Sequence, residues 1–209
     1  MNIFWQNSLV ILELTSALVL SSCSTISSGI YGVKKLKPVD EKTILHFSEK
    51  YTIPPGDSYK LDTSYITFLA SLDTTQYKEE RKNHYQPLQA LYYNQAGQLQ
   101  SFQINCYAGG FPNLNWDRNE IFSTFPPQQQ APVDSILPLG TLLHYLQPLS
   151  QSKEFTAEDL DYVVIVFWNR FMGRQSKRLI RFVQDNSNLA LDQNVKIIYV
   201  NNDNIFLGK

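Results

Sequence analysis

The sequence predicts an α/β fold with a single mixed sheet and flanking helices, based on two apolar runs, the helical segment between them and a hairpin. Residues 162–168 are almost uninterruptedly apolar, which is typical of a central strand buried on both faces. Residues 174–186 carry apolar side chains at helical spacing, and residues 195–200 form the next apolar run. Strand, helix and strand in this order predict a right-handed βαβ unit with parallel strands over residues 161–201.

A β-hairpin is predicted upstream of this unit. Residues 88–93 and 98–106 have strand patterns, and apolar and polar side chains alternate in the second segment. Between them lie residues 94–97, which read Asn-Gln-Ala-Gly, and a short polar turn of this kind favours a hairpin. The hairpin and the βαβ unit together predict a sheet with both parallel and antiparallel pairs.

Helices are predicted on both sides of the hairpin in the sequence. Asp40 is the expected N-cap of a helix that ends before a Pro-Pro pair, and Thr63 is the expected N-cap of a second helix. The charged residues 73–86 predict a loop or a frayed helix end. Beyond the hairpin, shorter helices are predicted over residues 116–122 and 139–146.

The N-terminus carries a second kind of signal. An apolar run over residues 9–20 leads into Ser-Ser-Cys, and this pattern resembles a bacterial lipoprotein signal peptide that ends at Cys23. The resemblance implies cleavage before Cys23 and a lipid on its thiol. It divides the chain into a signal peptide (1–22), a tether (23–38) and a single α/β domain (39–209).

Two features depart from that pattern and leave an alternative open. Residues 1–8 contain no Lys or Arg, and Glu13 lies inside the apolar run, where a central acidic residue opposes membrane insertion. The run is also shorter than the roughly 20 residues that a spanning helix needs. The alternative is therefore a buried N-terminal helix of a cytoplasmic protein.

Composition limits the classes of function. The chain has 209 residues, of which 43% are hydrophobic, enough to bury a sizeable core. Its formal net charge is −1, so the sequence offers no basic field and predicts no nucleic-acid partner. The three histidines, His46, His84 and His144, are far apart and lack metal-ligand spacing, so neither a metal nor another cofactor is expected.

The cysteine count bears on redox chemistry. Cys23 and Cys106 are the two cysteines, and lipidation of the first leaves no intramolecular disulfide in the mature protein. The alternating pattern places Cys106 on the same face as Phe102 and Ile104, which favours an inert core thiol. The other interpretation makes Cys106 a catalytic nucleophile, with His84 or His144 as its base.

The C-terminal segment resembles the thioredoxin-like superfamily. Residues 167–176 read Phe-Trp-Asn-Arg-Phe-Met-Gly-Arg-Gln-Ser, and residues 199–203 read Tyr-Val-Asn-Asn-Asp. The resemblance places the two redox positions on Met172 and Gln175, neither of which forms a thiolate, so it implies a scaffold without dithiol chemistry. The hairpin precedes the βαβ unit, which indicates a permuted or degenerate version, or an unrelated α/β arrangement.

An aromatic segment gives the candidate binding residues. Residues 107–132 are rich in Pro and Gly, and aromatic side chains on such a segment suit contact with a protein or glycan. The alternative is that the segment covers the core. The candidate residues are Tyr107, Phe111, Trp116, Phe122 and Phe125.

These observations favour a binding or accessory protein over an enzyme. The chain resembles lipoproteins of the Bacteroidetes type, which implies an outer-membrane lipoprotein that faces the periplasm of the cell envelope. The membrane would be contacted through lipidated Cys23, and the partner would be an envelope protein or glycan. The alternative function is a single-thiol enzyme that uses Cys106 as its nucleophile.

Overall fold

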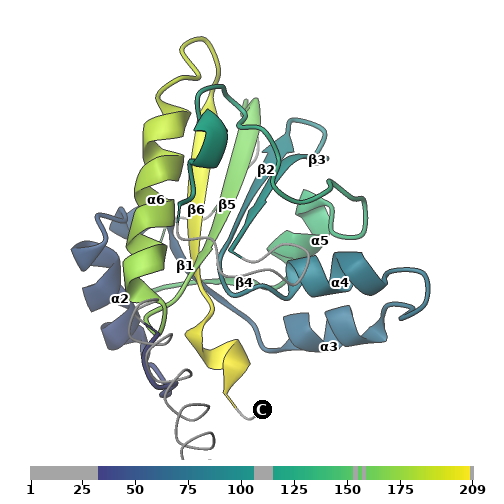
Figure 1. Cartoon of the computed structure of the whole chain (residues 1–209). Coiled ribbons are helices and arrows are strands. Elements are labelled where there is room, and N and C mark those ends of the chain that lie inside the picture. The colour runs from purple at the N-terminus through teal and green to yellow at the C-terminus, as the bar shows by residue number, and fades with distance from the viewer. Residues whose placement is uncertain (1–32, 106–114, 153–154, 157–158, 208–209) are drawn as a thin grey trace, which may run out of the picture.

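The computed structural model describes residues 33–105, 115–152, 155–156 and 159–207, which form one six-stranded mixed sheet with flanking helices (Figure 1). The strand order is β3-β2-β5-β6-β1-β4. Strands β5, β6 and β1 are parallel, and β2, β3 and β4 add antiparallel pairs at the two sides. The strands are β1 (Ser58–Leu61), β2 (Gln89–Asn94), β3 (Leu99–Ile104), β4 (Leu146–Pro148), β5 (Tyr162–Trp168) and β6 (Val195–Asn201).

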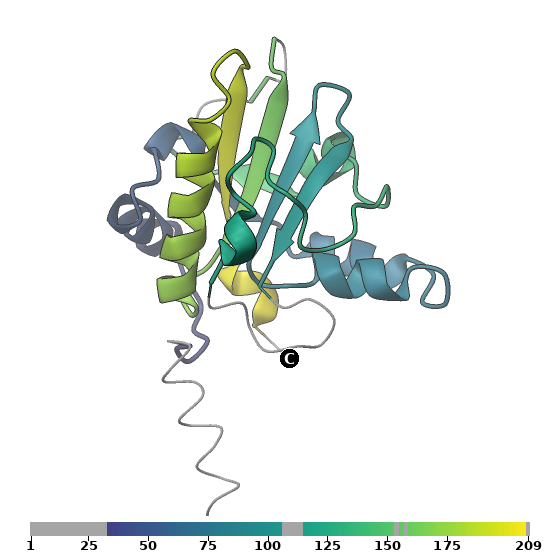
Figure 2. The ribbon, with the colours of Figure 1, turned by 45° about the horizontal axis from the view of Figure 1, so that its top comes forward.

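Helices cover both faces of the sheet. Figures 1 and 2 show α2 and α6 on one face and α3, α4 and α5 on the other. The α-helices are α2 (Glu41–Lys50), α3 (Ser64–Ser71), α4 (Lys78–His84), α5 (Leu139–Leu143) and α6 (Gly173–Ser187). Short 3-10 turns are η1 (Pro55–Asp57), η2 (Arg118–Glu120) and η3 (Asp203–Phe206).

Strand β5 explains why there are two cores. Val164, Val166 and Trp168 point into the core under α2 and α6. The alternate residues Val163 and Ile165 point into the core under α3 and α5, as does Phe167. A strand that is apolar at every position therefore needs a helical layer on each face, and the sequence provides both layers.

The main predicted elements are confirmed. Strands β5 and β6 are parallel and are joined by α6, and β2 pairs with β3 in an antiparallel hairpin whose turn contains Gly97 at φ 71°. The oxygen Oδ1 of Asp40 accepts a hydrogen bond from the Thr43 N–H at 2.8 Å, as expected of an N-cap.

Other elements differ from the prediction. The charged segment 73–86 contains helix α4, whose buried side chains are Asn83 and His84 and therefore give no apolar periodicity. Thr63 makes no capping hydrogen bond because its backbone is already helical, and Asp62 accepts the Ser64 N–H instead. The short strands β1 and β4 were not predicted, because neither has enough residues to show a period.

The two predicted helices beyond the hairpin are shorter than expected. The segment 116–122 forms only the 3-10 turn η2, and Oδ1 of Asp117 accepts the Phe122 N–H at 3.0 Å. The predicted helix 139–146 ends at Leu143, because the chain turns to pair β4 with β1 at the sheet edge.

Candidate functional site

The carboxyl ends of β5 and β6 are one candidate site, because ligands of open α/β sheets bind outside such strand ends. The two positions that the sequence resemblance marks lie here and are buried, Met172 at 5% exposure and Gln175 at 1%. The Met172 N–H donates to Oδ1 of Asn169 at 2.8 Å. Neither side chain supplies a thiolate, so the geometry offers no dithiol pair at these positions.

Asparagine side chains form hydrogen bonds among themselves and with the backbone at the carboxyl ends of β5 and β6. Nδ2 of Asn169 donates to the Pro87 carbonyl at 3.0 Å and to Oδ1 of Asn202 at 3.2 Å. Nδ2 of Asn202 also donates to the Pro87 carbonyl, at 2.8 Å. Pro87, which precedes the hairpin, is thus hydrogen-bonded to the residues that follow β5 and β6. The side-chain amides of Asn169 and Asn202 already have hydrogen-bond partners within the protein.

A buried carboxylate completes the same cluster. Oδ2 of Asp203 accepts hydrogen bonds from the Arg170 N–H and from Nδ2 of Asn201, both at 2.8 Å. Burial raises the pKa of the Asp203 carboxyl, and these hydrogen bonds oppose the shift. Asp203 is 1% exposed, so the group fixes the chain after β6 and is not presented to a ligand.

Tyr51 covers the first turn of α6 next to this cluster. Its ring packs edge-on against Trp168, with centroids 5.5 Å apart, and its hydroxyl occupies the space that a Cβ at position 173 would need. Gly173 is therefore required for close approach of the Tyr51 hydroxyl. The carboxyl ends of β5 and β6 are therefore covered by an aromatic side chain as well as by hydrogen-bonded asparagines.

Gly173→Ala is expected to lower the free energy of unfolding by about 1–2 kcal/mol, because the new Cβ collides with Oη of buried Tyr51. The measurement is urea unfolding followed by circular dichroism. Tyr51→Phe removes the colliding oxygen and leaves ring carbon Cζ 3.5 Å away, an ordinary contact. The double variant should therefore regain most of the loss; equal stability of Gly173→Ala and the parent would contradict this account.

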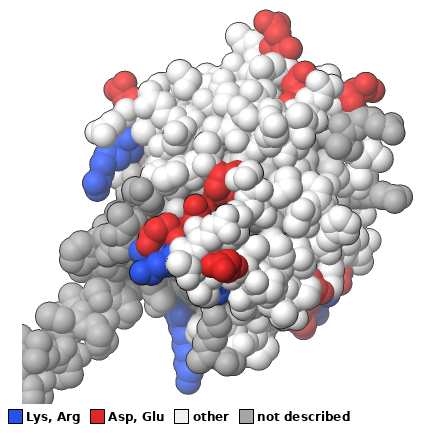
Figure 3. Space-filling model, turned by 90° about the vertical axis from the view of Figure 1, so that its right-hand side faces the viewer, with Lys and Arg blue, Asp and Glu red and all other residues white. Residues whose placement is uncertain are grey.

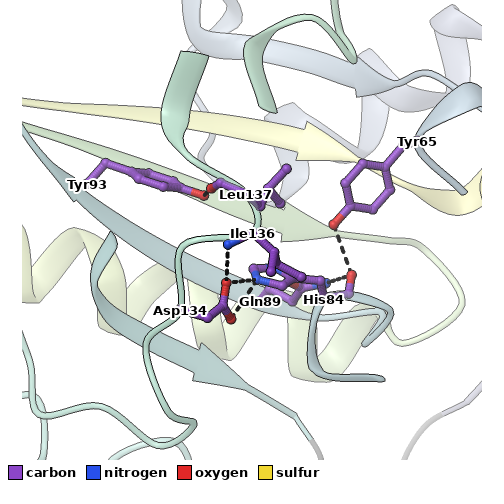
Figure 4. Close-up of polar contacts among 7 residues, drawn as sticks. All are labelled: Tyr65, His84, Gln89, Tyr93, Asp134, Ile136 and Leu137. Carbon is purple, nitrogen blue, oxygen red and sulfur yellow. Dashed lines mark hydrogen bonds and ion pairs between the residues drawn. The ribbon is translucent and has the colours of Figure 1, made fainter. Parts of the chain in front are cut away.

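A second polar network lies under α3 and α4 (Figure 4). Nε2 of His84 lies 3.0 and 3.1 Å from the two carboxylate oxygens of Asp134, and the imidazole stacks on Phe102 with centroids 4.7 Å apart. His84 is fully buried, and its Nδ1 has no hydrogen-bond partner among the described residues. The pair joins the end of α4 to the loop before α5.

The same network holds α3 against α4. The hydroxyl of Tyr65, on α3, donates to the His84 carbonyl at 3.0 Å, and Nε2 of Gln89 donates to that carbonyl at 2.8 Å. One carbonyl at the end of α4 is thus bound by a helix and by a strand. This arrangement fixes the spacing of the two helices, and so the shape of the surface between them.

An open groove of about 400 Å³ lies between α3 and α4, a volume within the range of ligand sites. Its α3 wall is apolar, and its α4 wall carries cations at positions i, i+3 and i+4 of one helix face. Tyr85 also lines the groove, and its ring contacts Phe206 edge-on. The α3 wall consists of Ile66, Leu69 and Ala70, the α4 wall of Lys78, Arg81 and Lys82, and Gln86 adjoins Tyr85.

No family model, curated protein or solved structure matches this chain. Among the described residues, no group of three or more His, Cys, Asp or Glu side chains could hold a metal ion. The groove between α3 and α4 is the candidate site because it is open and combines an apolar wall with grouped cations.

Figure 3 shows the side of the molecule on which α3 and α4 lie. Most side chains on this side are uncharged, and the acidic and basic ones are scattered or mixed. This agrees with the net charge of −1. Of the three cations on one face of α4, Lys82 pairs with Glu79 at 3.5 Å, and Lys78 and Arg81 form no ion pair with a described residue.

The predicted aromatic residues are not all on the surface. Trp116 and Phe122 are buried in the core under α6, and Phe125 is half-buried against Tyr92. For Trp116 and Phe122 this burial agrees with the covering role, not with the contact role. Tyr107 and Phe111 lie outside the described residues.

The remaining predicted residues fall into two groups. Cys23 and Cys106 lie outside the described parts of the chain. Of the histidines, His84 is buried as described, whereas His46 and His144 are exposed. Sequence reasoning missed the groove because α4 lacks apolar residues, although Lys78, Arg81 and Lys82 already show the spacing of one helix face.

Proposed function

We propose that this chain is a lipid-anchored binding or accessory module of the cell envelope, built on a redox-inactive, permuted thioredoxin-like scaffold. The observation that carries the proposal is the open groove between α3 and α4, beside a strand edge that is closed by its own hydrogen bonds. The carboxyl ends of β5 and β6 are covered, whereas the groove between α3 and α4 is open to a ligand. This combination favours binding over dithiol chemistry.

The permuted scaffold is supported by the position of the hairpin. In a permutation, the hairpin must lie beside the βαβ unit in the same sheet although it comes first in the chain. Strand β2 pairs antiparallel with β5, and Pro87 lies against Asn169 just beyond the end of β5. The segments that the resemblance names are therefore neighbours in space.

The anchor is proposed from Cys23 and places the module on the outer membrane, facing the periplasm. Within the described parts of the chain, no helix has the length and apolar character that crossing a bilayer requires. The intact mass of the protein from its native membranes tests the anchor. A chain that begins at Cys23 and carries acyl mass supports it, and an unlipidated chain that retains Met1 refutes it.

The groove fits an acidic, amphipathic helix of a partner protein. Such a helix would lay its apolar residues on Ile66 and Leu69 and its carboxylates against Lys78 and Arg81. Electrostatic complementarity of this kind fixes the register of a bound helix and raises its association rate. A glycan without charge would make no use of the α4 cations.

Photocrosslinking in native membranes tests this partner. Ala70, exposed on the apolar wall, is replaced by photoreactive benzoylphenylalanine, and the crosslinked segment is identified by mass spectrometry. We expect one adduct, on an acidic segment, that is lost in Lys78→Glu/Arg81→Glu. The matched control Lys42→Glu/Lys177→Glu alters exposed lysines on other helices and should retain the adduct. The groove would be refuted as the binding site if no adduct formed, or if the adduct persisted after the charge reversal Lys78→Glu/Arg81→Glu.

A single-thiol enzyme is the alternative, and one observation favours it. His84 is oriented by Asp134 through Nε2 and leaves Nδ1 without a partner among the described residues, as a base for a thiol would require. Full burial of His84 instead favours a structural role. Rapid labelling of Cys106 by a thiol reagent in the folded protein would support the enzyme, and labelling only after denaturation would exclude it.

A further inference from the structure

The segment that leads into the domain has an unusual surface. Residues 33–37 read Val-Lys-Lys-Leu-Lys, and every one of these side chains is exposed. Val33 is 41% exposed and Leu36 is 40% exposed, which makes them two of the most exposed large apolar side chains among the described residues. Exposed apolar residues between lysines are typical of segments that lie at a membrane surface.

The side chains of this segment are exposed although its backbone is hydrogen-bonded to the domain. The Lys34 N–H donates to the Phe171 carbonyl at 2.7 Å. The Val39 N–H donates to Oδ1 of Asn204 at 3.0 Å, and Nδ2 of Asn204 returns a hydrogen bond to the Val39 carbonyl at 2.9 Å. Lysines and apolar side chains are thus presented to solvent on a fixed backbone.

The local charge is positive. Lys34, Lys35 and Lys37 make no ion pair with a described residue. Nη2 of Arg170 donates to the Lys37 carbonyl at 3.3 Å, and the charge of Arg170 is offset by the Asp203 carboxylate. The nearest acidic residues along the chain, Asp40 and Glu41, accept backbone N–H groups at 2.8 and 2.7 Å. The cations are therefore available to an anionic surface.

We propose that residues 33–37 bind anionic lipid headgroups and so fix how the domain sits on the membrane. The inference rests on the proposed lipid anchor: Lys34 follows Cys23 by eleven residues, which span at most about 40 Å. Figures 1 and 2 show the start of the described chain near the first turn of α6 and near η3. That end of the domain would face the bilayer, with the lysines at the headgroups and Val33 and Leu36 at the acyl boundary.

The test is a lysine footprint of the lipidated full protein in vesicles. Amines are acylated with a water-soluble reagent in phosphatidylcholine vesicles and in equimolar phosphatidylcholine–phosphatidylglycerol vesicles, and each site is read by mass spectrometry. In the anionic vesicles we expect acylation of Lys34, Lys35 and Lys37 to slow by about fivefold each. Lys50 and Lys82, exposed on other elements, serve as internal references and should not change. Equal rates in the two vesicles at all five lysines would overturn the proposal.

A variant pair separates specific contact from net charge. Lys34→Gln/Lys35→Gln/Lys37→Gln should transfer from anionic to neutral vesicles on the order of 100-fold faster than the parent. The control Lys50→Gln/Arg118→Gln/Arg181→Gln alters exposed cations away from that end of the domain, has the same net charge and should transfer at the parental rate. Equal transfer of both variants would refute a role of the segment.

The two proposals fail in different ways. If the intact mass shows no lipid, the anchor is refuted, and the same protein is then tested by flotation with the two kinds of vesicle. Flotation with anionic vesicles alone would still support residues 33–37 as a membrane contact, provided the Lys34/Lys35/Lys37 variant does not float. Absence of flotation would overturn it.

Discussion

Replacing Trp116 by alanine is expected to lower the free energy of unfolding by about 3–5 kcal/mol. The side chain is fully buried in the core under α6, and its loss would leave a cavity that the surrounding residues cannot fill. The segment is also held in place, because Nδ2 of Asn186 donates to the Phe122 carbonyl at 2.9 Å. Urea unfolding followed by circular dichroism measures the loss.

Two controls show whether the loss comes from packing. Trp116→Phe keeps most of the apolar contact and removes an indole N–H that has no partner among the described groups, so its loss should be much smaller. Phe125→Ala truncates a half-buried ring at the edge of the same segment and should also cost less. If Trp116→Ala were as stable as the parent and lost only a binding partner, the contact role would be the correct one.

Asp134→Ala is expected to lower the free energy of unfolding by up to about 3 kcal/mol, because it leaves Nε2 of fully buried His84 without an acceptor. It also removes the acceptor of the Ile136 N–H, 3.2 Å from Oδ1. The loop before α5 should loosen from α4, and adduct formation in the groove should fall with it. Unfolding and hydrogen exchange measure the two effects.

Asp134→Asn is the matched control. Its carbonyl oxygen can take the place of Oδ1 and accept from both His84 and Ile136, so less than half of the alanine effect is expected. If both variants lowered the free energy of unfolding equally, the carboxylate of Asp134 would not stabilise the fold through these hydrogen bonds. No loss in either would exclude the pair as the support of the groove.

The parts of the fold that apolar pattern determines could be predicted. Strand β5 is buried on both faces, so its seven residues form an apolar run that identifies a central strand from sequence alone. Helix α6 buries Leu179 and Val183 on one face, and the spacing of these residues is the signal. Strand β1 has four residues and a half-buried lysine, so no periodicity marks it.

The candidate site was harder to predict because it depends on contacts between distant residues. His84 and Asp134 are fifty positions apart, and nothing in either local sequence indicates the pair. Helix α4 buries Asn83 and His84. The burial of His84 is compensated by its contacts with Asp134 and Phe102, which a hydropathy pattern does not show. An aromatic residue such as Trp116 fits a surface and a core equally well in sequence, and only its packing separates the two roles.

The position of β6 has a consequence for how the chain reaches its native state. It is the last strand along the described chain, yet it lies between β5 and β1 and pairs with both. Until β6 has left the ribosome, β1 and β4 cannot join the hairpin and β5, so the sheet remains in two parts. Completion of the sheet therefore depends on β6, whichever of the other strands pair first.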